Sequence, residues 1–211
     1  MKEEKFRIIT IGRQLGCGGS QIGHEAAKRL GMECYDKRLI ELACSYGEVD
    51  LERMQGVDEK MPNPFLYSVP REIQNEKTGR GIAVNDMMFN LQSEVIRRLA
   101  ARESCIIIGR CADYVLRDVP GVTTIFLHGD MESRIKRVEE KRKLEKNQAV
   151  SLIKKTDKAR RNYYECYTGK RWGARDSYDI TLNTARLGLE KCVDLICRIY
   201  AGGEAELVLK D

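Results

Sequence analysis

Arg13-Gln14-Leu15-Gly16-Cys17-Gly18-Gly19-Ser20 is the stretch that decides the fold, because hydrophobic patterns of two different periods meet across it. Before it, residues 6–11 form a run rich in β-branched side chains, of the length typical of a buried strand. After it, apolar residues over 22–30 recur at helical spacing, and Gly31 follows as a C-cap. A strand, a glycine-rich turn and a helix together favour an anion site. The backbone N–H groups of such a turn point inward, and the helix N-terminus adds partial positive charge.

The same stretch matches the phosphate-loop consensus G-x-x-x-x-G-K-[ST] only in part. Alignment on Gly18-Gly19-Ser20 places Ser20 at the position of the magnesium-binding hydroxyl. Gly19 then stands at the lysine position and Arg13 at the position of the first glycine. The loop alone therefore leaves two interpretations open, a phosphate site or a tight strand-to-helix turn with no ligand.

Length and composition indicate one α/β domain with inserts in a chain of 211 residues. The eight cysteines contain no C-x-x-C pair, and a charged N-terminus runs directly into the first strand, so we expect reduced thiols in a cytoplasmic protein. Two histidines give little support for a zinc site. No apolar run approaches the roughly 20 residues that a membrane helix requires, so we expect no membrane partner.

The net charge of +5 is unevenly distributed along the chain. Residues 134–175 hold 15 Lys or Arg against 5 Asp or Glu, a local net charge of +10. A basic segment on an otherwise acidic body indicates an anionic ligand. Nucleic acid is the less favoured ligand, because stacking aromatic residues do not alternate with these charges.

The remaining sequence alternates strand and helix patterns. Residues 105–108 form a continuous apolar run, which is typical of a strand buried on both faces of a parallel sheet. The alternation predicts a three-layer α/β/α fold with a parallel sheet. We expect a single domain over 1–211, with its core at 5–44, 86–135 and 176–201, a loop-rich substrate insert at 45–85 and a basic helical lid at about 140–175. The lid helix has so few aliphatic residues that we expect it to stand away from the core.

Charged residues follow two of the expected strands at their carboxyl ends, where ligands gather in open α/β sheets. Asp36 and Arg38 follow the second strand, and Gly109 and Arg110 end the third. The guanidinium of Arg110 can bind a phosphate through two hydrogen bonds. Asp36 has a second, compatible interpretation as the N-cap of the next helix, and Asp86 is expected to cap a later one.

This order of parts resembles the P-loop nucleoside monophosphate kinases, and most closely the cytidylate kinase-like family. The resemblance covers nearly the whole chain and rests on the loop ending in Gly18-Gly19-Ser20, on Tyr35-Asp36-Lys37, on Ile108-Gly109-Arg110, on the basic residues 157–164 and on residues 178–184. Two positions depart from cytidylate kinases proper. These carry the lysine that Gly19 replaces, and an aspartate where this chain has Cys111.

The resemblance implies transfer of the γ-phosphoryl of ATP, with Mg²⁺, to a small-molecule nucleotide, CMP or dCMP being the leading acceptor. An arginine on the moving phosphoryl contributes about 10³ to 10⁵ in rate in related systems, which is enough to replace a lysine. The implied catalytic residues are Arg13, Lys158, Arg160 and Arg161. Those implied for ATP are Gly16, Cys17, Gly18, Gly19, Ser20 and Gln21, with Ser20 also at the metal, and those for the acceptor are Asp36, Arg38, Gly109 and Arg110.

Two other functions stay open on the sequence. One is a nucleotide-binding regulatory protein that has lost catalysis, which Gly19 at the lysine position favours. The other is a basic nucleic-acid-binding module that uses residues 134–175. A monomer and a homodimer are both compatible with the sequence.

Overall fold

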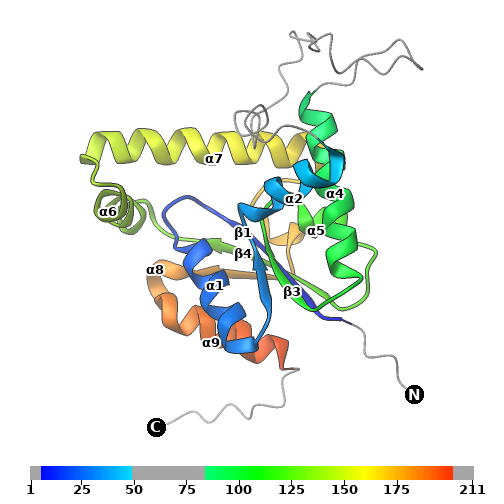
Figure 1. Ribbon diagram of the computed structural model, residues 1–211. Helices are drawn as coiled ribbons and strands as arrows, with labels where there is room; N and C mark the ends of the chain where they lie inside the picture. The colour runs from blue at the N-terminus through cyan, green and yellow to red at the C-terminus, as the bar shows by residue number, and fades with distance from the viewer. Residues whose placement is uncertain (1–5, 49–83, 202–211) are drawn as a thin grey trace.

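A five-stranded parallel sheet forms the centre of the protein (Figure 1). The structure is a computed structural model that describes residues 6–48 and 84–201. The strand order is β2-β3-β1-β4-β5, and every neighbouring pair runs parallel, as the sequence predicts. The strands are β1 (Ile8–Arg13), β2 (Glu33–Tyr35), β3 (Cys105–Ile108), β4 (Val122–His128) and β5 (Ile180–Asn183).

Helices cover both faces of this sheet and complete the predicted three layers. On one face, Ile8 and Ile107 pack with side chains of α2 (Arg38–Gly47), α4 (Val84–Ala100) and α5 (Ala112–Val115). On the other face, Ile9 and Ile106 pack with side chains of α1 (Gly19–Leu30) and α9 (Leu189–Tyr200). Because successive strand residues point to opposite faces, the unbroken apolar run of β3 serves both cores at once.

Two further helices form a hairpin beside the loop that follows β1. They are α6 (Met131–Arg142) and α7 (Lys146–Thr168), the long yellow helix of Figure 1. Ile135 of α6 packs against Ile153 of α7. The expectation that the basic helix stands away from the core is wrong for its C-terminal half, where Tyr163 and Tyr164 are buried. The prediction rested on the small number of aliphatic residues, whereas the buried area in this half of the helix comes from aromatic rings.

One local expectation is confirmed and two are corrected. Gly31 caps α1 in the left-handed conformation, as predicted. The N-cap of α2 is Lys37, so Asp36 does not cap that helix. Asp86 does not cap α4 but lies inside its first turn, where it accepts a hydrogen bond from the Tyr167 hydroxyl at 2.8 Å.

Two short elements flank β5 in the chain. A 3₁₀ turn, η2 (Arg175–Ser177), precedes β5, and α8 (Thr184–Leu187) follows it. All eight cysteines lie within the described ranges, and each is a free thiol. Among residues 6–48 and 84–201, no helix has the length and apolar character to cross a membrane. Most of the expected insert at 45–85 lies outside the described residues.

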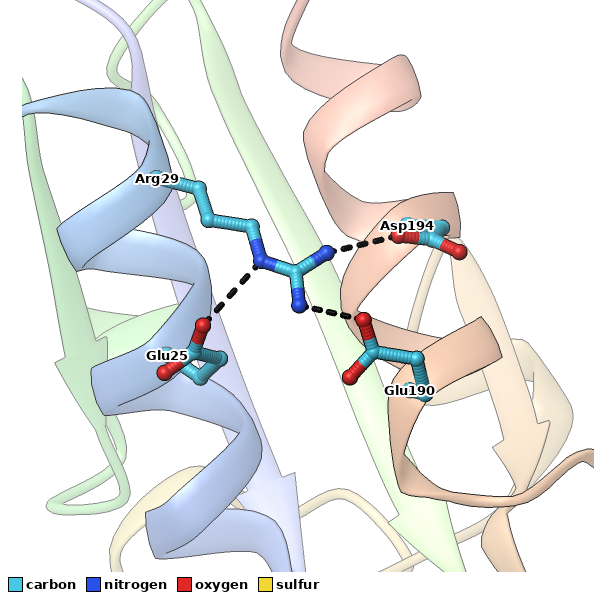
Figure 2. A network of polar contacts seen from close by, with 4 residues as sticks. All are labelled: Glu25, Arg29, Glu190 and Asp194. Carbon is cyan, nitrogen blue, oxygen red and sulfur yellow. Dashed lines mark hydrogen bonds and ion pairs between the residues drawn. The ribbon is translucent and has the colours of Figure 1, made fainter.

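An ionic network on the surface joins α1 to α9 (Figure 2). Arg29 donates hydrogen bonds to Glu25 on its own helix at 3.1 Å, and to Glu190 and Asp194 on α9 at 2.5 and 2.7 Å. The network lies at the end of α1 remote from the glycine-rich loop. An ion pair of this network can therefore serve as a control when an ion pair at the loop is substituted.

Candidate active site

The glycine-rich loop between β1 and α1 adopts a conformation that its glycines make possible. Gly16 and Gly18 both have φ of 83°, in the left-handed region that favours glycine. A Cβ atom on Gly16 would lie 2.7 Å from the carbonyl oxygen of Arg134, and one on Gly18 would lie 2.6 Å from a methyl group of Leu189. Gly18 is the N-cap of α1, so the loop delivers the positive end of the helix dipole to the site.

A cavity of about 640 Å³ opens on this loop. Gly16, Gly18, Gly19, Ser20 and Gln21 line one side of it. The volume is in the range typical of small-molecule sites. Two carboxylates, Asp36 and Glu41, and seven cationic side chains complete the charged part of the lining, the cations being Arg13, Lys37, Arg110, Arg137, Lys141, Arg142 and Arg160. Such an excess of positive charge favours a ligand with several negative charges.

The side chain of Arg13 crosses the loop from the end of β1. A Cβ atom on Gly19 would lie 2.7 Å from the Cβ and 2.9 Å from the Cγ of Arg13, so the arginine stem occupies the space above Gly19. Farther along, a Cβ atom on Gly109 would lie 3.0 Å from Cζ of Arg13. The guanidinium also forms an ion pair with Asp36 at 3.4 Å. Arg13 thus spans the distance between the glycine-rich loop and the end of β3.

Asp36 and Ser20 both line the cavity and lie in direct contact. The Ser20 hydroxyl donates a hydrogen bond of 2.7 Å to Oδ2 of Asp36, while Oδ1 of the same carboxylate faces Arg13. A carboxylate and a hydroxyl are oxygen ligands of the kind that Mg²⁺ prefers. These two residues therefore fit a magnesium ion beside the loop.

The backbone is strained where β3 ends. Gly109, Arg110 and Cys111 have φ of 78°, 59° and 54°, three consecutive residues in the left-handed region. For the two non-glycine residues this conformation costs roughly 1–2 kcal/mol each. Such strain is concentrated at functional sites, where surrounding structure holds it in place. The bend brings the side chain of Arg110 to the cavity.

Arg110 is a buried cation, with 5% of its surface exposed. Burial lowers its pKa to about 10, and the positive charge of the neighbouring Arg13 guanidinium also lowers it. Arg110 therefore remains charged at neutral pH in a place where charge is unfavourable. An anionic ligand would remove that penalty.

The carbonyl groups of the loop point toward arginines of the α6–α7 hairpin. Arg160 donates to the carbonyl of Arg13 at 3.1 Å, and Arg137 donates to that of Gly16 at 2.8 Å. The carbonyl of Leu15 accepts from Nε of Arg134 at 2.7 Å. These arginines place positive charge behind the loop as well as around the cavity.

The structure brings most of the predicted site residues together and leaves some of them apart. Arg38 is largely exposed and pairs with Glu33 at 3.6 Å. Lys158 is exposed, and the guanidinium of Arg161 lies 5.9 Å from the centre of the Trp172 ring. The Cys17 side chain is fully buried, and burial raises the pKa of its thiol. In the described structure none of these four residues lines the cavity.

Asp157 contacts the glycine-rich loop, and the sequence did not single it out. Its carboxylate accepts a hydrogen bond from the Leu15 N–H at 2.8 Å and a second one from Arg134. The only signal in the sequence is that Asp157 is the single acidic residue between positions 146 and 164.

Comparisons with known proteins agree with this architecture. The structure resembles an uncharacterized protein from Eubacterium ventriosum ATCC 27560 with a TM-score of 0.68 and 25% identity, over 93% of this chain and 99% of that one. It also resembles a shikimate kinase from Bacteroides thetaiotaomicron, with a TM-score of 0.53, 12% identity and coverage of 92% and 98%. It resembles a gluconokinase from Sinorhizobium meliloti 1021 with a TM-score of 0.54 and 14% identity, over 93% of this chain and 95% of that one.

At these identities the two kinases show a shared fold alone. No curated protein sequence matches the chain. The sequence model of the cytidylate kinase-like family, however, matches residues 8–186. That match takes in the glycine-rich loop, the strained bend at Arg110 and the α6–α7 hairpin, and the protein belongs to the cytidylate kinase-like family.

Proposed function

We propose that the protein is an ATP-dependent kinase that transfers a phosphoryl group to a small anionic acceptor, CMP or dCMP being the leading candidate. One observation carries the proposal. A glycine-rich loop at a helix N-terminus and a buried, strained Arg110 open on the same cationic cavity. Phosphoryl transfer needs two phosphates in line and positive charge around the moving group, and little acid–base chemistry from the protein.

On this proposal the loop and the start of α1 hold the phosphates of ATP. The backbone of Gly16, Gly18 and Gly19 lines the cavity, and Ser20 and Gln21 follow in the first turn of α1. Ser20 and Asp36 would hold Mg²⁺, which neutralises charge on the phosphate oxygens when it is bound. The contact between these two side chains supports a role for Asp36 at the metal, in place of the acceptor contact inferred from the sequence.

Arg13 takes the part that a lysine has in the consensus loop. Its stem lies over Gly19, at the consensus lysine position, and its guanidinium lies next to Gly109. From there it reaches both the donor phosphates at the loop and the acceptor anion at Arg110. The path of the Arg13 side chain then requires glycine at position 19, since any larger residue would collide with the arginine stem.

We assign roles to the other cationic residues according to whether they line the cavity. Arg160 lines the cavity and supports the same transition-state charge as Arg13. Lys158 and Arg161 lie outside the lining, so we assign them no contact with the phosphoryl group. Gly109 and Arg110 hold the acceptor anion, while the exposed Arg38 at most adds to the surrounding field.

Cytosine recognition requires residues other than Cys111. Cys111 is 4% exposed and belongs to an aromatic cluster with Phe126, Tyr163 and Tyr164. It therefore cannot serve as the aspartate of cytidylate kinases proper. The acceptor has to be identified by experiment across more than one chemical class.

The test is formation of ADP from Mg·ATP with a panel of acceptors. The panel contains CMP, dCMP, the other nucleoside monophosphates, shikimate and gluconate. We expect ADP formation that requires Mg²⁺ and one acceptor, and that is lost in Arg110→Met. If ATP binds tightly and no acceptor yields ADP above background, the second candidate holds, a nucleotide-binding regulatory protein, which Gly19 at the lysine position favours.

A further inference from the structure

One residue of the phosphate loop, Leu15, has both its N–H and its carbonyl bound by buried side chains of the α6–α7 hairpin. The N–H of Leu15 donates to Oδ1 of Asp157 at 2.8 Å, and the carbonyl of Leu15 accepts from Nε of Arg134 at 2.7 Å. Arg134 also donates to Oδ2 of Asp157, so the three residues close a ring of hydrogen bonds. Arg134 and Asp157 are 4% and 8% exposed. Water therefore has little access to the two side chains that form the ring.

The ring belongs to a wider arrangement in which arginines of the α6–α7 hairpin bind loop carbonyls. Arg137 binds the carbonyl of Gly16, next to Leu15, and Arg160 binds that of Arg13. In a trans peptide unit the C=O and the N–H point in opposite directions. The carbonyl of Leu15 is directed at Arg134, so the N–H of Gly16 in the same peptide unit points away from that side chain, and Gly16 lines the cavity in which an anion would bind.

We propose that Asp157 and Arg134 are positioning residues that hold the glycine-rich loop in its anion-binding conformation before any ligand binds. The identity of the anion as a nucleotide phosphate rests on the proposed function, whereas the conformation of the loop does not. The distinction from an ordinary structural ion pair is physical. Two apolar side chains of similar volume replace a buried ion pair with little loss of stability. They cannot, however, satisfy the N–H and the carbonyl of Leu15.

The deciding variant is therefore Arg134→Met combined with Asp157→Leu. In the ligand-free protein we expect a melting temperature within a few degrees of wild type, and exchange of the Leu15 amide proton that is about 10- to 100-fold faster, measured by NMR. Affinity for ADP and for pyrophosphate, measured by calorimetry, should fall by a similar factor, because the loop must be ordered during binding. The matched control is Arg29→Met with Asp194→Leu, the same substitutions in the network of Figure 2. The control should change neither the exchange rate of the Leu15 amide nor the affinity for ADP and pyrophosphate.

A second comparison covers the case in which the double variant does not fold. Asp157→Asn and Asp157→Leu both remove the charge, but only the asparagine keeps an oxygen for the Leu15 N–H. We expect Asp157→Asn to retain slow exchange and most of the ADP affinity, and Asp157→Leu to lose both.

Two results would separate this inference from the proposed function. If a folded variant without the acceptor oxygen keeps the wild-type exchange rate at Leu15 and the wild-type affinity, Asp157 and Arg134 do not position the loop. If the wild-type protein binds neither ADP nor pyrophosphate, the proposed function fails, and the exchange rate at Leu15 alone decides the inference.

Discussion

Replacement of Arg110 by methionine should make the ligand-free protein more stable. Burial lowers the pKa of Arg110 to about 10, well below that of an arginine in water, and one pKa unit corresponds to about 1.4 kcal/mol. The charge therefore destabilises the ligand-free fold by on the order of 3 kcal/mol. Lost hydrogen bonds of the guanidinium offset part of the gain, which leaves a net increase of about 1–2 kcal/mol in the free energy of unfolding. For a protein of this size that is a rise of roughly 3–6 °C in Tm.

The sign of the pH dependence follows from the same shift. The folded pKa lies below the unfolded one, so the penalty is fully present below about pH 10 and fades as the pH rises from there toward the unfolded value. The difference in Tm between Arg110→Met and wild type should accordingly be constant from about pH 6 to 9. Arg110→Lys is the control at about pH 6, where the lysine keeps a charge at this position and should not show the gain.

The assay is thermal denaturation followed by circular dichroism, with and without inorganic phosphate. Phosphate should raise the Tm of the wild type more than that of Arg110→Met, since only the wild type has the buried Arg110 cation to neutralise. A ligand-free Arg110→Met protein that melts at or below the wild-type temperature would refute the reasoning. It would mean that Arg110 stabilises the fold and is not held for an anion.

Three further substitutions test other contacts of the site. Gly19→Ala should cost about 1–3 kcal/mol in urea denaturation, because the new Cβ would lie 2.7 Å from Cβ of Arg13, and Arg13→Gly in the same chain should recover most of that loss. Tyr167→Phe should lower stability by about 1 kcal/mol through loss of the hydrogen bond to Asp86, with ADP formation unchanged; a loss of turnover would place Tyr167 at the site. Asp36→Asn should raise the Mg²⁺ concentration that gives half-maximal ADP formation about 10-fold or more, and an unchanged requirement would remove Asp36 from the metal.

The elements that position the site could be predicted from the sequence because their signals are local. The β-branched run of β1, the glycines of the loop and the helical spacing after them lie within residues 8–31. The apolar run of β3 ends at Gly109-Arg110, which indicated the second half of the site. Both predictions depend on contacts between near neighbours or on burial of whole strands.

The contacts that the sequence did not reveal join residues far apart in the chain. Asp157 meets Leu15 across 142 positions, and nothing in the local pattern of α7 points to that partner. The exposure of Arg38 depends on where α2 begins and on its pairing with Glu33. The path of Arg13 over Gly19 likewise required the folded loop, although both residues stood out as departures from the consensus.

The most direct test of the account is the rate of acceptor-dependent ADP formation in Arg13→Met and in Arg13→Gly combined with Gly19→Lys. The double variant restores the full consensus G-x-x-x-x-G-K-S and removes the arginine stem that would collide with a side chain at position 19. We predict a loss of about 10³-fold in kcat for Arg13→Met, with folding and ATP binding retained, and recovery of at least about 10-fold in the double variant. Undiminished turnover in Arg13→Met would contradict the assignment of Arg13 as the replacement for the lysine.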